Sequence, residues 1–283
     1  MRPQVVVDIG NSRIKWGLCS PDGQRLVATA SLPEDPLAWQ EQLARWGLQN
    51  PSPPPPPRGG EGEQEGFSPL SASGRGEGGR GSETWVLTSV RPQRCGRLRD
   101  WLLAQGHRVV LLERAEQLPL ATRVVEPNRV GIDRLLDAVA AKRRLPLGQP
   151  AVLVDAGSAV TIDWLDESHV FCGGAIFPGL RLMAQSLNDY TAFLPVVTIH
   201  EPIPVLPAPD TVPAIETGVF HAVASGIEKI VRSLAARSVV APALFVTGGD
   251  GALLCRALDT PMPAVLWPDQ TLEGILASAE ALP

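Results

Sequence analysis

Short apolar runs alternate with turn residues over the first part of the chain, a pattern typical of a β-meander. Apolar positions at helical spacing follow it, and further strand-like runs come after residue 83. This pattern predicts strands at 5–8, 14–19, 25–31, 84–89 and 108–112, and helices at 36–48 and 95–105. We therefore expect a first α/β unit over residues 1–118.

The second part of the chain repeats this mixture of apolar strands and amphipathic helices. It predicts strands at 151–155, 160–165, 169–172 and 243–247, helices at 133–144, 180–194 and 212–236, and two shorter elements at the end. We expect residues 119–283 to form a second α/β unit. At 283 residues the chain is long enough for two such units with a cleft between them.

Residues 51–83 have a different composition from the rest of the chain. Five consecutive prolines lead into a stretch rich in Gly, Ser, Glu and Arg, which cannot bury enough apolar surface to offset the entropy of ordering. We predict a disordered insertion in the first unit, whose deletion should change stability and turnover little. Glycines 74, 76 and 79 match a dinucleotide-binding fingerprint, but no predicted strand precedes them and no helix follows, so we reject that interpretation.

Composition and charge exclude several classes of protein. A net charge of −5 lacks the basic surface expected of a nucleic-acid-binding protein. Four cysteines and four histidines are scattered without metal-ligand or disulfide spacing. Because the chain shows neither an apolar leader nor eighteen consecutive apolar residues, we expect a cytoplasmic protein that does not bind membranes.

An Asp-x-Gly tripeptide follows an apolar strand in both units. Residues 5–12 and 152–159 align as an apolar run, then Asp8 or Asp155, then a glycine and a small polar residue. Glycine lets backbone N–H groups approach phosphate oxygens closely, and an Asp suits a cation that bridges phosphates. A single copy would indicate only a hairpin, but two copies, with a third glycine turn at 247–250, favour nucleotide binding. No P-loop motif occurs in the sequence.

The duplicated turns resemble those of the acetate and sugar kinase, Hsp70 and actin superfamily. That resemblance implies an α/β fold of two ribonuclease-H-like lobes, with mixed β-sheets flanked by helices and an ATP cleft between the lobes. Three further segments resemble type III pantothenate kinases: a Gly-x-Asp-Arg motif at 131–134, Asp-Ala-Gly-Ser-Ala-Val-Thr at 155–161, and a Gly-Gly-x-Ile-x-Pro-Gly turn at 173–179. The resemblance covers nearly the whole chain except residues 51–83.

The family resemblance implies ATP-dependent phosphorylation of pantothenate to 4′-phosphopantothenate, the first step of coenzyme A biosynthesis. It also implies a homodimer, Mg²⁺ and a monovalent cation, K⁺ or NH₄⁺. Carried over by motif, the residues that would contact ATP are Asp8, Ile9, Gly10, Asn11, Ser12, Arg13, Ile14, Lys15 and Ser158. Asp155 would bind the monovalent cation. Pantothenate would contact Gly131, Ile132, Asp133, Arg134 and Thr211, with Asp133 as proton acceptor.

The chain departs from the family pattern at three positions. Ser12 and Ser158 stand where threonine is usual, which retains the hydroxyl, and Val124 stands where a substrate-contacting tyrosine is common. Two other functions remain open from the sequence: another small-molecule kinase of the same superfamily, or a regulator that binds a nucleotide without turnover. The Asp133–Arg134 pair favours an enzyme, because a protein that only binds nucleotide needs no base.

Overall fold

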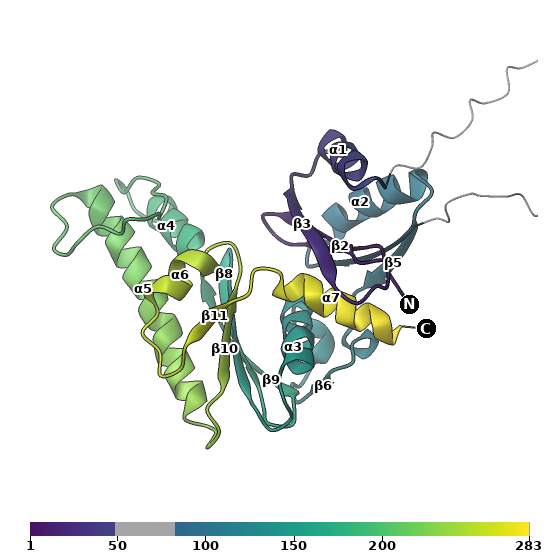
Figure 1. Cartoon of the computed structure of the whole chain (residues 1–283). Helices are drawn as coiled ribbons and strands as arrows, with labels where there is room; N and C mark the ends of the chain where they lie inside the picture. Colours follow the sequence, from purple (N-terminus) through teal and green to yellow (C-terminus); the bar gives the residue numbers. More distant parts are fainter. Residues whose placement is uncertain (49–82, 283) are drawn as a thin grey trace, which may run out of the picture.

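The computed structural model describes residues 1–48 and 83–282, which form two α/β lobes joined by crossing helices (Figure 1). The predicted insertion at 51–83 and its glycine motif lie outside the described residues, apart from Glu83. Each lobe holds one mixed β-sheet flanked by helices, so the predicted fold class is confirmed.

The first lobe is built on a five-stranded sheet with strand order β3-β2-β1-β4-β5. Its elements are β1 (Val5–Ile9), β2 (Ile14–Cys19), β3 (Leu26–Leu32), α1 (Pro36–Trp46), β4 (Thr84–Ser89), α2 (Pro92–Ala104) and β5 (Arg108–Leu112). β1, β2 and β3 pair antiparallel, whereas β4 and β5 continue the sheet in parallel from β1. Val5 and Val7 of β1 face a core shared with Trp39 of α1 and Leu98 of α2, whereas Val6 faces the cluster that includes the helices between the two sheets.

The second lobe repeats this arrangement in a six-stranded sheet, β11-β10-β7-β8-β9-β6. Its strands are β6 (Ala121–Thr122), β7 (Ala151–Ala156), β8 (Ala159–Leu165), β9 (Val170–Pro178), β10 (Ala243–Thr247) and β11 (Ala264–Leu266). β7, β8 and β9 pair antiparallel and β10 runs parallel to β7, just as β4 runs parallel to β1. The sequence repeat therefore corresponds to a repeat of the fold, with β1 and β7 as the equivalent central strands.

Seven helices and two short 3₁₀ segments are present in the described residues. Those after the first lobe are η1 (Ala115–Gln117), η2 (Pro127–Arg129), α3 (Ile132–Arg144), α4 (Leu180–Asp189), α5 (Thr211–Ala235), α6 (Gly251–Ala257) and α7 (Gln270–Ala281). Within these residues, none of the helices combines the length and apolar composition needed to cross a membrane.

Helices α3 and α7 cross between the two sheets (Figure 1). They approach so closely that a Cβ on Gly274 of α7 would lie 2.0 Å from the carbonyl oxygen of Leu136 of α3. The Met1 amino group donates to the carbonyl of Leu282 at 3.0 Å, so the chain ends meet beside the first lobe. Helix α7 belongs to the C-terminal part of the chain but packs on the first lobe. The predicted domain boundary at 118/119 therefore stays a prediction.

Two predictions about local structure are wrong. Residues 173–178, expected as a turn, belong to strand β9; Gly174 is required there because a Cβ would lie 1.8 Å from the carbonyl oxygen of Ile162 in β8. Helix α4 ends at Asp189 rather than at residue 194. Pro195 disfavours helical geometry in the residue before it, and the side chain of Asn188 donates instead to the carbonyl of Leu194 at 2.7 Å.

Candidate active site

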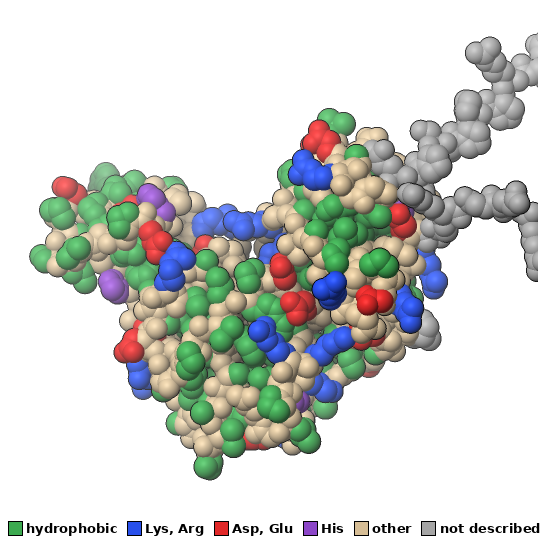
Figure 2. Space-filling model, in the orientation of Figure 1, with side chains coloured by type: hydrophobic (Ala, Val, Ile, Leu, Met, Phe, Trp, Pro, Cys, Tyr) green, Lys and Arg blue, Asp and Glu red, His purple; other side chains and the backbone are tan. Residues whose placement is uncertain are grey.

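The two Asp-x-Gly turns face each other across a cleft between the lobes. The hydroxyl oxygens of Ser12, after β1, and Ser158, after β7, lie 3.0 Å apart. The cleft has a volume of about 280 Å³, and Figure 2 shows the molecule hollowed between the lobes with Lys and Arg side chains across the gap. The predicted site residues that line it are Asp8, Gly10, Asn11, Ser12, Arg13, Lys15, Asp133, Asp155 and Ser158.

Each turn is closed by one backbone hydrogen bond. The N–H of Gly10 donates to the carbonyl of Arg13 at 3.0 Å, and the N–H of Gly157 donates to the carbonyl of Ala159 at 3.1 Å. Between these bonds the chain reverses from one strand into the next, so the intervening residues project into the cleft. This geometry is suited to phosphate oxygens, which accept hydrogen bonds from exposed N–H and hydroxyl groups.

The third glycine turn, after β10, is pressed against the second Asp-x-Gly turn. Gly248 has a φ of +94°, and a Cβ there would lie 2.4 Å from the Asp155 carboxylate and from the carbonyl of Ala156. Only glycine fits this position. Gly249 follows it along the cleft and lies beside the guanidinium group of Arg13, so the cleft is bordered by three turns rather than two.

Four carboxylates line the cleft, those of Asp8, Asp133, Asp155 and Asp250, and Lys15 lines it as well. Burial raises the pKa of Asp8 to about 7 and that of Asp155 to about 6, and the carboxylate of Asp133 adds to both shifts. The charge of Lys15 lowers both pKa values but does not cancel the burial effect. Without a bound cation the cleft therefore carries carboxylates that repel one another, and a cation would stabilise their charged forms.

Asp133 stands in the first turn of α3, and its carboxylate reaches the cleft. Its Oδ1 accepts the backbone N–H of Arg134 at 2.8 Å. A Cβ on Gly131 would lie 2.5 Å from that same oxygen, so glycine at 131 leaves room for the carboxylate. Burial raises the pKa of Asp133, and the N–H of Arg134 partly opposes the shift. A half-buried carboxylate of raised pKa is a suitable proton acceptor.

Arg134 is bound to Asp163 rather than directed freely into the cleft. Its Nε donates to Asp163 Oδ2 at 2.8 Å, and its Nη2 donates to the other carboxylate oxygen. Both side chains are largely buried, so this fork anchors the start of α3 to β8.

Five other predicted residues also do not line the cleft. Ile9 and Ile14 are fully buried in the first-lobe core, where they hold the strands on either side of the turn. Ile132 is buried between the lobes and Gly131 shapes the position of Asp133. Thr211 lines a different, mainly apolar cavity of about 490 Å³ between α4 and α5.

Two polar side chains in the cleft lie outside every motif that the sequence analysis identifies, those of Arg181 and Thr271. Arg181 lies in the first turn of α4, and its Nη2 donates to the hydroxyls of Ser12 at 3.0 Å and Ser158 at 3.1 Å. Thr271, at the start of α7, donates to the buried Asp137 carboxylate at 2.8 Å. Burial, followed by the charge of Asp155, raises the pKa of Asp137 well above its ordinary value. The sequence indicates Arg181 only as a basic residue at the start of a predicted helix. No feature of the sequence distinguishes Thr271.

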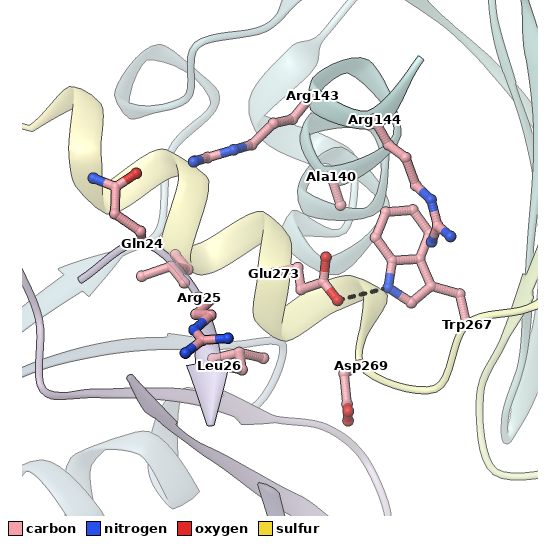
Figure 3. Close-up of a pocket in the computed structure, with 10 residues that line it drawn as sticks. Gln24, Arg25, Leu26, Ala140, Arg143, Arg144, Trp267, Asp269 and Glu273 are labelled. Carbon is pink, nitrogen blue, oxygen red and sulfur yellow. Dashed lines mark hydrogen bonds between the residues drawn. The ribbon is translucent and has the colours of Figure 1, made fainter. Parts of the chain in front are cut away.

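A larger cavity of about 530 Å³ lies outside the cleft, between the β2–β3 turn and helices α3 and α7 (Figure 3). In it the indole N–H of Trp267 donates to Glu273 at 2.9 Å, and the Arg144 guanidinium lies 4.5 Å from the Trp267 ring. These contacts fix the segment before α7, whose Pro268 carbonyl accepts Lys15 Nζ at 3.3 Å inside the cleft. By fixing the position of Pro268, these contacts help to hold the Lys15 side chain in place.

The cleft suits a cation held jointly by protein and nucleotide. Among the described residues, no three Asp, Glu, His or Cys side chains are grouped closely enough to hold a metal ion by themselves. Mg²⁺ is usually bound by one or two carboxylates together with substrate phosphates and water. Asp8 fits that requirement, because it stands at a strand end beside a phosphate-type turn, and Asp155 stands in the equivalent place of the second lobe, where a second cation could be held.

Comparison with known proteins identifies the family. The family model described as type III pantothenate kinase matches residues 62–233. The chain is 33% identical to a type III pantothenate kinase of Akkermansia muciniphila over 69% of this chain and 77% of that protein. It is 31% identical to one of Alkalilimnicola ehrlichii over 96% of this chain and 95% of that protein.

Solved structures support the fold. A Campylobacter jejuni protein assigned to the Baf family of transcriptional activators superposes with a TM-score of 0.55 and 20% identity, covering 98% of this chain and all of that one. At this identity the likeness concerns the fold alone. The match to the Alkalilimnicola ehrlichii protein extends over nearly the full length of the chain, and the family model includes the motifs at 131–134, 155–161 and 173–179. The chain therefore belongs to the type III pantothenate kinase family.

Proposed function

We propose that this chain transfers the γ-phosphoryl group of ATP to the hydroxymethyl group of pantothenate and forms 4′-phosphopantothenate, the first step of coenzyme A biosynthesis. Membership of the family supports this activity. The observation that carries it is the position of Asp133, whose carboxylate faces the same cleft as both phosphate-type turns. A base for an alcohol acceptor thus stands beside the place where the phosphates would lie.

In this proposal the turns of the two lobes bind the ATP phosphates together. Backbone N–H groups at residues 10–13 and the hydroxyls of Ser12 and Ser158 would donate to phosphate oxygens. Lys15 would add a positive charge at the same point. Phosphoryl transfer has a loose transition state with charge spread over the transferring oxygens, so these donors act mainly by positioning and charge stabilisation.

Asp133 would orient the acceptor hydroxyl and take its proton late in the transfer. A carboxylate is too weak a base to remove the proton of an alcohol beforehand. Burial raises the pKa of Asp133 toward the working range, which strengthens it as an acceptor. The N–H of Arg134 holds the carboxylate by its hydrogen bond to Oδ1, and glycine at 131 leaves room for that orientation.

Two cations fit the charge of the cleft. Asp8 would hold Mg²⁺, and Asp155 would hold a monovalent cation, K⁺ or NH₄⁺. When bound, these ions would neutralise phosphate charge and reduce the repulsion between the cleft carboxylates. The grouping of the Asp8, Asp133 and Asp155 carboxylates around one cleft supports a site built for positive charge.

The pantothenate site would lie beside the start of α3, with Gly131, Ile132 and Arg134 contributing backbone atoms and the remaining guanidinium N–H groups. Thr211 is separated from this region, because it lines the cavity between α4 and α5. We therefore propose that Thr211 contacts pantothenate bound to a second copy of the chain. That arrangement requires the homodimer.

The surface around α4 and α5 supports a dimer. Exposed apolar side chains gather in the segment that joins these helices, and green atoms cover that part of the molecule in Figure 2. They include Tyr190, Phe193, Val205 and Leu206. A monomer rarely exposes so many large apolar side chains within one segment, so a second copy of the chain is the partner that we propose for this surface.

The small charged metabolites of this reaction belong to the cytoplasm, which we propose as the location of the protein.

The proposal is tested by identifying the product. Purified protein is incubated with ATP, Mg²⁺ and K⁺, with pantothenate or with a panel of sugars and small hydroxy acids, and the products are identified by mass spectrometry. The proposal requires phosphopantothenate as the main product. Phosphorylation of another acceptor instead would make the chain a different kinase of the superfamily, and nucleotide binding without any product would make it a regulator.

A further inference from the structure

Arg181 is placed at the meeting point of the two phosphate-type turns, although no motif assigns it a role. It is the second residue of α4, two positions after Gly179, which precedes the helix. A Cβ on Gly179 would lie 2.1 Å from the carbonyl oxygen of Gly157, and the N–H of Gly179 donates to the Ser158 carbonyl at 3.0 Å. The start of α4 is therefore fixed against the second turn, which fixes where the Arg181 side chain begins.

The guanidinium group bridges the lobes without a carboxylate partner. It donates to Ser12 of the first lobe at 3.0 Å and to Ser158 of the second at 3.1 Å. Among the described residues, Arg181 forms no ion pair within 4.0 Å. Its charge also acts on the Asp250 carboxyl group in the same cleft, where it and Arg13 oppose the rise in pKa that burial causes. The positive charge thus faces the cleft without a carboxylate in direct contact.

This placement is unfavourable unless an anion is present. A cation in the first turn opposes the helix dipole, and the first turn of α4 has no acidic residue to offset it. Neutral serine hydroxyls are weaker acceptors for a guanidinium than ionised phosphate oxygens, which can accept two parallel hydrogen bonds. A phosphate group in the cleft would therefore replace the serines as the partner of Arg181.

We propose that Arg181 binds the transferring phosphoryl group. When ATP occupies the cleft, the guanidinium leaves the hydroxyls of Ser12 and Ser158 and donates to γ-phosphate oxygens, and the two hydroxyls then donate to phosphates themselves. An arginine at this point stabilises charge that spreads over the phosphoryl oxygens during transfer. The inference rests on the proposed kinase function, to which it adds a residue.

The competing role is a simple clasp, in which Arg181 only ties the lobes together through the serines. The two roles differ in their dependence on the γ-phosphate. A phosphate ligand discriminates ATP from ADP, whereas a clasp affects both nucleotides and the stability of the ligand-free protein alike.

The experiment measures nucleotide binding by calorimetry, with no acceptor present, together with turnover in the presence of pantothenate. For Arg181→Ala we expect at least tenfold weaker binding of a non-hydrolysable ATP analogue, less than threefold weaker binding of ADP, and a kcat lower by roughly 10²–10³-fold. Arg181→Lys should recover only part of kcat, because it keeps the charge and loses the planar fork. Arg256→Ala, which removes a surface arginine paired with Glu201, should leave all values unchanged.

The proposal is overturned if Arg181→Ala keeps kcat within threefold of the original chain. It is also overturned if both nucleotides lose affinity equally while the melting temperature falls, which is the signature of a clasp. Because the binding comparison needs no acceptor, its result is separate from whether pantothenate is the substrate. A failure of pantothenate phosphorylation in the original chain would instead contradict the proposed function.

Discussion

The hydroxyls of Ser12 and Ser158 lie 3.0 Å apart, although 146 positions separate them in the sequence. They occupy equivalent places after β1 and β7, the central strands of the two lobes. The duplication thus brings two copies of one turn together, face to face. A phosphate chain entering between them would contact both lobes, so nucleotide binding and the relative position of the lobes are linked.

Removal of Arg134 should destabilise the protein as well as impair catalysis. We predict that Arg134→Ala lowers the free energy of unfolding by about 3–5 kcal/mol, because it leaves the Asp163 carboxylate buried and unpaired. Urea denaturation followed by circular dichroism measures this. Arg123→Ala, which breaks a more exposed pair with Asp166, should cost less than about 1 kcal/mol. Equal stability of the two variants would show that the Arg134–Asp163 fork does not anchor α3.

A methyl group at position 179 should disturb the second turn. Gly179→Ala places a Cβ 2.1 Å from the Gly157 carbonyl oxygen, so backbone must move, and we predict a loss of about 1–3 kcal/mol with a raised KM for ATP. Gly96→Ala is the control, since a Cβ there meets no atom within 4 Å and alanine favours the α2 helix by up to about 1 kcal/mol. An unchanged KM for ATP in Gly179→Ala would show that the start of α4 does not affect the nucleotide site.

Stability without cations should fall as pH rises. The folded-state pKa values of Asp8, about 7, and Asp155, about 6, exceed the ordinary value, so folding retains protons that the unfolded chain releases. The stability they contribute is fully present below about pH 4 and is lost as pH rises through 6–7. We predict a falling melting temperature over this range in chelator, and a shallower slope for Asp8→Asn.

A matched surface variant controls for general effects of pH in that experiment. Asp100→Asn removes an exposed carboxylate of α2 far from the cleft and should leave the slope of the original chain. Saturating Mg²⁺ and K⁺ should reduce the loss at high pH, since cations favour the ionised carboxylates. If the melting temperature falls with pH equally in Asp8→Asn and Asp100→Asn, the cleft carboxylates do not control the pH dependence of stability.

The proposed dimer predicts a specific effect of a charge between α4 and α5. Phe193 is 95% exposed in the single chain. Phe193→Asp should shift the protein from dimer to monomer in sedimentation equilibrium and reduce turnover, because Thr211 would no longer reach the second active site. Val239→Asp, equally exposed but beyond the C-terminal end of α5, should stay dimeric and active. A monomeric original chain with full turnover would refute the shared site.

The sequence predicts the parts of the site that are local and fails where distant segments meet. An apolar strand followed by Asp-x-Gly forms its turn from residues that are adjacent in the sequence. The turns at Asp8 and Asp155 can therefore be predicted from the sequence. The glycine pair at 173 and 174 predicts a turn, whereas Gly174 is required because strand β8 approaches it closely and Gly173 because its φ is positive. The role of Arg181 depends on hydrogen bonds to other elements, and so does the paired hydrogen bond from Arg134 to Asp163. Hydrophobic periodicity contains no information about such contacts.

The proposed catalytic role of Asp133 is tested most directly by its amide variant. Asp133→Asn keeps the size of the side chain and removes its capacity to take a proton. Steady-state ADP release with Mg²⁺, K⁺ and pantothenate is measured for both chains, with ATP affinity and melting temperature as controls. We predict pantothenate-dependent turnover that falls by roughly 10²–10⁴-fold in Asp133→Asn, with folding and ATP binding retained. Turnover within tenfold of the original chain would contradict the account, because the acceptor hydroxyl would then lose its proton elsewhere.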